Sequence, residues 1–159
     1  MIKGKIKRLK ELKRIVAASR KRGERVVFTN GCFDIIHLGH IRYLEKASSL
    51  GNKLVVALNS DASERRLKGN KRPIIPEQER AVIVAAFGCV DYVIIFAEAT
   101  PLRLIKALQP DVLVKGGDWR KADIVGKDFV ESYGGKVASV GFVKGYSSSS
   151  IIAGIKKSK

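Results

Sequence analysis

Two histidines stand three residues apart in a short segment, and they are the only histidines of the chain. His37 and His40 follow the apolar run Val26–Phe28, at the start of a helical pattern that begins at Leu38. Residues three apart share one face of a helix, and the first helical turn offers unpaired N–H groups and a partial positive charge. The segment therefore predicts a phosphate site in which two imidazoles donate hydrogen bonds to phosphate oxygens.

Glycines accompany the histidine pair. Gly31 permits a tight turn after the first apolar run, and Gly39 lets a phosphate approach the backbone without a Cβ in the way. Two other interpretations are weaker. A lone histidine is usually an ordinary surface or core residue, but here both histidines of the chain share one helix start. A zinc site would need further ligands that the neighbouring sequence does not supply, so we assign no metal-ligating residues.

Two further segments carry groups suited to phosphate. Lys115 stands at the end of the apolar run Val112–Val114, directly before two glycines, where its ammonium would act as a point charge on phosphate. A run of four serines, Ser147–Ser150, follows Gly145. Capping a helix uses one serine, so we expect others in the run to bind phosphates.

Apolar runs and helical patterns alternate along the chain. We expect strands at residues 26–28, 54–58, 92–96, 112–114 and 136–140, and helices at 6–22, 38–49, 76–87, 101–108, 127–133 and 151–157. The polar, basic segment 60–75 is expected to be a long functional loop. The alternation predicts the α/β class: a single Rossmann-like doubly wound domain, whose five-stranded parallel sheet is covered by helices on both faces. Ligands of such sheets bind beyond the carboxyl ends of the strands.

The length of 159 residues suits one domain. We expect a nucleotidyltransferase domain over residues 1–159, with a basic helix over 1–24 and a catalytic core over 25–155. No apolar run approaches the roughly 20 residues that span a bilayer, and no secretory signal is visible. The two cysteines have no CxxC spacing, which fits a reducing compartment. We therefore expect a cytoplasmic protein.

The formal net charge of +16 is unusual. It has three interpretations: nucleic-acid binding, steering of anionic substrates, and a lysine-rich surface that maintains solubility. Much of the excess lies at the two ends of the chain, and aromatic residues are not interleaved with it as in single-strand binders. We favour solubility and steering.

The segment Gly31–His40 resembles the GxFDxxHxGH signature of the cytidylyltransferase-like nucleotidyltransferases. Other segments resemble the heptose 1-phosphate adenylyltransferase branch of that family: Asn59–Asp61, Arg72-Pro73, Glu79-Arg80, Val114–Asp118 and Gly145–Ser149. The resemblance covers about Arg25 to Ile155. No sugar-kinase domain accompanies it in this sequence, so we expect a stand-alone adenylyltransferase.

The resemblance implies a reaction. AMP would pass from ATP to D-glycero-β-D-manno-heptose 1-phosphate, giving ADP-heptose and pyrophosphate for lipopolysaccharide core synthesis. The attacking phosphate is already anionic, so catalysis would rest on positioning and charge stabilisation. Mg²⁺ would be bound mainly through the triphosphate. The implied partners are ATP and a sugar phosphate, without nucleic acid or membrane, and family members are often homo-oligomers.

The resemblance also implies roles for individual residues. The catalytic set is His37, His40 and Lys115. The nucleotide-binding set is Thr29, Gly31, Phe33, Gly39, Gly117, Asp118, Ser147, Ser148 and Ser149. The sugar-phosphate-binding set is Asn59, Asp61, Arg72 and Arg80. Asp34 is expected to organise the turn rather than to catalyse.

Three alternatives stay open. A CTP-dependent glycerol-3-phosphate cytidylyltransferase has the same signature, but Phe142 stands where the RTEGIST motif of that branch carries an arginine, which favours ATP. An archaeal-type FAD synthase is not excluded by the same difference. From another class, a basic nucleic-acid-binding protein would show salt-dependent binding without turnover.

Overall fold

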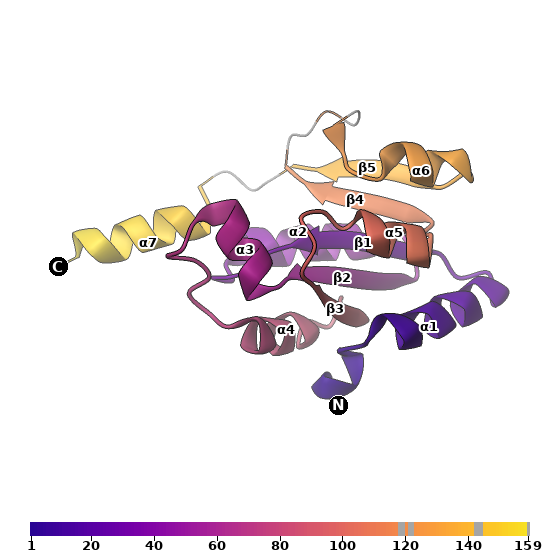
Figure 1. Cartoon of the computed structure of the whole chain (residues 1–159), viewed down its shortest axis with the longest axis horizontal. Helices are drawn as coiled ribbons and strands as arrows, with labels where there is room; N and C mark the ends of the chain where they lie inside the picture. The colour runs from indigo at the N-terminus through magenta and orange to yellow at the C-terminus, as the bar shows by residue number, and fades with distance from the viewer. Residues whose placement is uncertain (118–119, 121–122, 142–144, 159) are drawn as a thin grey trace.

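A five-stranded parallel sheet forms the centre of the molecule (Figure 1). The structure is a computed structural model that describes residues 1–117, 120, 123–141 and 145–158. The strand order is β3-β2-β1-β4-β5, which places β1 in the middle of the sheet. The strands are β1 (Val26–Gly31), β2 (Lys53–Asn59), β3 (Tyr92–Phe96), β4 (Val112–Gly116) and β5 (Lys136–Val140). The predicted parallel α/β architecture is confirmed.

Helices cover both faces of the sheet, as the doubly wound pattern predicts. One face packs against α2 (Leu38–Ser48) and α4 (Glu77–Ala85), through a core that includes Val27 and Leu44. The other face packs against α1 (Leu9–Lys21), α5 (Leu102–Leu108) and α6 (Lys127–Ser132), through a core that includes Phe28 and Leu104. Successive residues of β1 thus serve opposite cores, because side chains alternate along a strand.

The first helix begins later than predicted. A short 3-10 helix, η1 (Ile2–Lys5), precedes α1, and the helix expected from residue 6 starts at Leu9. Ile6 instead forms an isolated parallel bridge with Val93 at the free edge of β3. Its apolar side chain, which fits the helical spacing, packs against the sheet core from an extended backbone.

The long loop predicted over residues 60–75 is wrong in its first half, which forms helix α3 (Asp61–Lys68). Ser60 caps this helix, since its side chain accepts a hydrogen bond from the Ser63 N–H at 3.1 Å. Acidic residues lie in the first turn and basic residues in the last, which suits the helix dipole. The buried residues of α3 are Ser63 and Glu64, so apolar periodicity could not reveal the helix.

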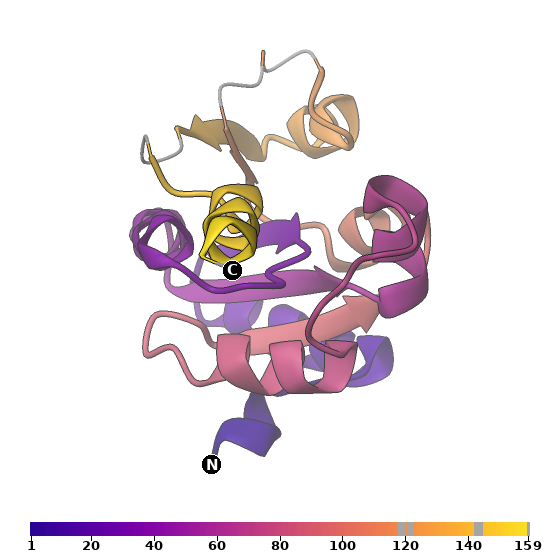
Figure 2. The same ribbon diagram turned by 90° about the vertical axis from the view of Figure 1, so that its left-hand side faces the viewer.

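The last helix, α7 (Ser148–Lys157), begins earlier than predicted, with Ser147 as its N-cap. Figure 1 shows α7 projecting from the edge of the molecule where β1 and β4 end, and Figure 2 shows it end-on. None of its residues is buried. Among all the described residues, no helix is long and apolar enough to cross a membrane.

Two aspartates join neighbouring strands at the amino edge of the sheet. Asp111 lies directly before β4, and its Oδ2 accepts a hydrogen bond from the Val26 N–H of β1 at 2.8 Å. Asp91 lies directly before β3, and its Oδ2 accepts one from the Leu54 N–H of β2 at 2.8 Å. Each aspartate also donates its own N–H to the carbonyl of the same partner residue. These hydrogen bonds hold neighbouring strands together at the amino edge. The long loops lie at the opposite, carboxyl edge.

Candidate active site

The two histidines stack on each other at the start of α2. Their ring centroids are 3.9 Å apart and the rings are inclined by 24°. His37 is the N-cap residue, with an extended backbone, and its carbonyl accepts a hydrogen bond from the His40 N–H at 2.9 Å. The predicted common face is confirmed. Both rings stand beyond the carboxyl end of the central strand, beside the first-turn N–H groups of a helix.

Burial keeps both imidazoles neutral at neutral pH. It lowers the pKa of His37, and it lowers the pKa of His40 to about 4, with smaller contributions from the charge that His37 would carry if protonated and from the charge of Lys68. A neutral imidazole has one N–H donor and one acceptor nitrogen. The Nδ1 atoms of both rings are buried and have no hydrogen-bond partner among the described residues. Such atoms are costly in a folded protein, so each needs an explanation, such as a bound water, an ion or a catalytic role.

Phe33 packs against the ring of His40. Its backbone adopts the left-handed region with φ of +49°, which is uncommon outside glycine. Its ring centroid lies 5.3 Å from that of His40. A Cβ on Gly31 would stand 2.8 Å from Cε2 of this ring, so glycine is required there for packing. Phe33 is itself buried, and its predicted nucleotide contact would have to come from its backbone.

The start of α7 lies against the loop that leads into α2. The Ser148 hydroxyl donates to the Ile35 carbonyl at 3.1 Å, and Tyr146 stacks on His37 with 6.4 Å between ring centroids. A Cβ on Gly39 would stand 3.0 Å from the His37 ring and 3.2 Å from Cβ of Tyr146. Gly39 therefore permits the close approach of these two segments.

The predicted serines have unequal freedom to bind a phosphate. Ser147 caps α7 by accepting a hydrogen bond from the Ser150 N–H, and its hydroxyl also pairs with that of Ser150. Ser148 holds Ile35. Ser149 lines an open groove, of about 460 Å³, that it shares with Lys71 and Arg72. Ser149 is thus the member of the set with the most accessible position.

Asp34 holds the turn that precedes the histidines against a distant segment of the chain. Its buried carboxylate accepts hydrogen bonds from the N–H groups of Ile74 and Ile75 at 2.8–2.9 Å. Its Oδ2 also lies 2.8 Å from Nε of Arg72, whose side chain is 12% exposed. The loop before the histidines is in this way joined to the segment after α3. Arg72 meets Asp34 and still borders the groove beside α7, so it stays a candidate for sugar-phosphate binding.

Arg80 occupies a different place from the predicted one. Its side chain is fully buried, and its guanidinium donates to the carbonyls of Ile75 and Cys32 at 2.8 and 2.5 Å. It also pairs with Asp61 at 2.7 Å and with Glu64 at 3.1 Å. The prediction that Arg80 contacts the sugar phosphate directly is therefore wrong. Its role is to hold α3 and α4 to the loop that precedes the histidines, and Asp61 takes part in that network.

The remaining predicted residues lie on or near β1 and β4. Thr29 is buried inside β1, and its hydroxyl is hydrogen-bonded to that of Tyr43, so its side chain does not reach the site. Gly117 has φ of +109° and donates its N–H to the Val140 carbonyl, which links the ends of β4 and β5. Asp118 lies outside the described residues, as do Trp119 and Phe142.

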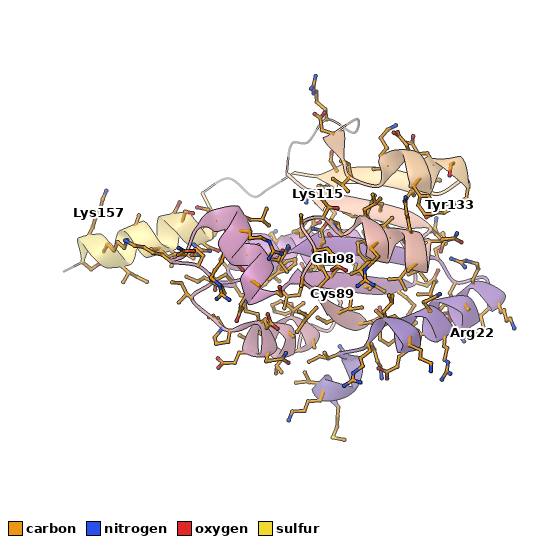
Figure 3. All side chains as sticks on the ribbon, viewed as in Figure 1. Arg22, Cys89, Glu98, Lys115, Tyr133 and Lys157 are labelled. Carbon is orange, nitrogen blue, oxygen red and sulfur yellow. The ribbon has the colours of Figure 1, made fainter. Side chains whose placement is uncertain are left out.

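Lys115 and Asn59 stand on the sheet face opposite to the histidines. Lys115 is at the end of β4 (Figure 3), and burial lowers the pKa of its ammonium. Both residues line a cavity of about 260 Å³ at the carboxyl edge. Groups that are suited to binding phosphate therefore lie on both faces of the sheet at the end of β1.

Lys68 lies close enough to the histidines for its charge to act on His40, and the sequence did not reveal this position. It belongs to the last turn of α3, its charge lowers the pKa of His40, and it pairs with Glu64 at 3.8 Å. The signal that could have found it was the Ser60 cap followed by the acidic-to-basic gradient of α3. Because segment 60–75 was predicted as a loop, the sequence did not place Lys68 relative to the histidines.

Comparison with known proteins defines the class to which this fold and site belong. A model of the Cytidylyltransferase-like family matches residues 28–154, and the chain belongs to that family of nucleotidyltransferases. Bifunctional protein HldE of Geobacter metallireducens is 61% identical over 148 residues, and Bifunctional protein HldE of Proteus mirabilis is 52% identical over 147 residues. These matches cover 93% and 92% of this chain but 30% and 31% of the relatives. The chain therefore spans less than a third of their length.

Solved structures agree with the fold. The lipopolysaccharide core biosynthesis protein from Thermoplasma volcanium is 30% identical, with a TM-score of 0.63. That match covers 79% of this chain and all of that protein. Pantoate-beta-alanine ligase from Francisella tularensis is 14% identical with a TM-score of 0.62, over 95% of this chain and 76% of the ligase, which shows a common fold alone.

Proposed function

We propose that this chain transfers AMP from ATP to D-glycero-β-D-manno-heptose 1-phosphate, giving ADP-heptose and pyrophosphate for lipopolysaccharide core synthesis. The stacked pair of neutral imidazoles at the start of α2 carries this proposal, because it suits a phosphate chain at the end of the central strand. The identity of 52–61% to HldE proteins supports the substrates, as does the 30% identity to the lipopolysaccharide core biosynthesis protein from Thermoplasma volcanium.

The mechanism needs donors and cations rather than a base. An oxygen of the sugar phosphate attacks the α-phosphorus of ATP, a new P–O bond forms, and the bond to the β-phosphate breaks as pyrophosphate leaves. His37 and His40 donate hydrogen bonds to the α-phosphate, where charge develops in the transition state. Lys115 and Lys68 add positive charge on either side. The acceptor is ionised before it reacts, so no side chain has to remove a proton.

Magnesium fits this site through the substrate. The described residues contain no group of three or more His, Cys, Asp or Glu side chains that could hold a metal ion. Mg²⁺ commonly keeps several waters and binds substrate phosphates, which needs no such group. When bound, it would neutralise charge on the triphosphate. We place the reaction in the cytoplasm, with ATP and a sugar phosphate as partners.

A matrix of pyrophosphate-release assays tests the substrates. ATP, CTP and GTP are each paired with heptose 1-phosphate, glycerol 3-phosphate and FMN, in the presence of Mg²⁺. We expect release with ATP and heptose 1-phosphate. Release only with CTP and glycerol 3-phosphate, or only with FMN, would refute the proposed substrates and leave the reaction class standing.

Substitution of the histidines tests the mechanism. His37→Ala and His40→Ala should each lower kcat by about 100-fold or more, the range for lost transition-state donors. Lys115→Ala should also lower kcat. Lys136→Ala is the matched control, because Lys136 is an exposed lysine that pairs in register with Val112, at the other end of β4. Near-normal kcat in both histidine variants would overturn the mechanism.

A further inference from the structure

The cavity of about 260 Å³ at the carboxyl edge has a polar floor built by three neighbouring strands. Asn30 comes from β1, Asn59 from β2 and Lys115 from β4. The residues two positions earlier in each strand belong to the core beneath α1 and α5. Because side chains alternate along a strand, these three side chains share that face of the sheet, opposite to the histidines on α2.

The other wall of the cavity is largely apolar, although Thr100 and Asp123 also line the cavity. Leu67 comes from α3, Pro101 precedes α5 and Val125 precedes α6. Leu67 and Val125 are 59% and 43% exposed, which is high for large aliphatic side chains that face a cavity. An aliphatic wall opposite amides and an ammonium suits a ligand with one apolar face, several hydroxyls and a phosphate. A monosaccharide phosphate has this chemistry.

Asn30 is the polar group of the floor that has most freedom to bind. Its carboxamide is half-buried and makes no hydrogen bond to any other described residue. The Asn59 amide already donates to the Ser63 hydroxyl at 2.9 Å, which leaves its oxygen as an acceptor. A carboxamide both donates and accepts, so it matches a sugar hydroxyl, which does the same.

The geometry points to this cavity as the pocket for the sugar ring of the acceptor, with Asn30 as a residue that determines specificity. This inference rests on the proposed function. The cavity volume lies just below the roughly 300–1,000 Å³ of pockets for drug-sized ligands, which is room for one sugar ring. The nucleotide phosphates would lie at the histidines, the sugar would lie on the opposite face, and the two phosphates would meet beside Lys115 at the end of β1.

The test separates the affinity for the acceptor from that for ATP. Asn30→Ala and the nearly isosteric Asn30→Asp should raise KM for heptose 1-phosphate about tenfold, the effect of losing one to two hydrogen bonds. KM for ATP should stay within about twofold, because the ATP phosphates bind on the other face. Titration calorimetry with heptose 1-phosphate alone should show the same loss of affinity. Asn52→Ala, at an exposed position outside the cavity, is the control.

A second variant probes the apolar wall. Leu67→Trp should fill the cavity and weaken heptose 1-phosphate binding with little effect on KM for ATP. Unchanged KM and affinity for the acceptor in the Asn30 variants overturn the pocket, as does a loss confined to ATP. A wild-type protein that is active on another acceptor and does not bind heptose 1-phosphate overturns the proposed sugar substrate, which is a different result.

Discussion

At the scale of single residues, Arg80 and Glu64 form a charge pair whose two side chains are both fully buried. Moving charges out of water is expensive, and the expense is offset only while the partners remain together. Burial raises the pKa of Glu64, and the nearby positive charges of Lys68 and Arg80 oppose that shift. The pair therefore depends on the tertiary fold, and it links α3 with α4.

Removal of Arg80 should be strongly destabilising. We expect Arg80→Met to lower the free energy of unfolding by about 3–5 kcal/mol, because it leaves the buried Glu64 without its closest cationic partner. The double variant Arg80→Met/Glu64→Leu should recover part of this loss. Urea denaturation followed by circular dichroism measures both.

The control for this experiment is Arg103→Met, which breaks the exposed ion pair of Arg103 with Glu98. Exposed pairs contribute at most about 1 kcal/mol, so this variant should remain close to the wild type. A similarly small effect in Arg80→Met, or no recovery in the double variant, would show that the buried pair is not what holds α3 to α4.

At the scale of elements, the sequence predicted every strand and most helices, because buried parallel strands are apolar throughout and surface helices repeat their apolar residues. Helix α3 was not predicted, because its buried residues are polar. Arg80 was misjudged for a related reason: its ionic partners, Asp61 and Glu64, lie on a different helix, and sequence spacing does not reveal such pairs. The histidine pair was found because its two residues are close in sequence, whereas the partners of Asp34 lie about 40 residues away.

The contact between the loop before α2 and the segment after α3 depends on Asp34. Asp34→Asn keeps the size of the side chain but removes the charge that strengthens its bonds to Ile74 and Ile75. We expect trypsin to cleave after Lys68 and Lys71 about tenfold faster in this variant, since a hydrogen bond to a charged group contributes about 1.5–3 kcal/mol. Mass spectrometry over a time course identifies the sites.

Asp128→Asn is the matched control for this digestion, because the Asp128 side chain is 99% exposed. Faster cleavage spread along the whole chain would indicate global destabilisation. Unchanged cleavage would indicate that Asp34 does not hold the segment. Only a local increase supports the role proposed for the carboxylate.

At the scale of the whole molecule, the net charge of +16 acts on every anion that approaches. Both substrates of the proposed reaction are anions, so the field should speed their encounter with the site. We expect kcat/KM for ATP to fall several-fold between about 0.05 and 0.5 M salt, as screening shortens the range of the field. Saturating kcat should change little, because encounter no longer limits it.

A kcat/KM that does not depend on salt would leave solubility as the role of the charge. Gel-shift assays with DNA and RNA over the same salt range test the other class of function. Tight binding with a steep logarithmic salt dependence, in a protein without pyrophosphate release, would favour a nucleic-acid-binding protein.

The aspartates at the amino edge have a consequence for redesign. Asp91 and Asp111 fasten that edge to the strands beside them, and both are far from the carboxyl edge where the histidines and the cavity lie. Residues that secure the scaffold are in this way separated from residues that choose the ligand. New acceptor preferences could then be sought by randomising Asn30, Leu67 and Val125 alone. Every member of such a library would keep Asp91, Asp111 and the hydrogen bonds that they make.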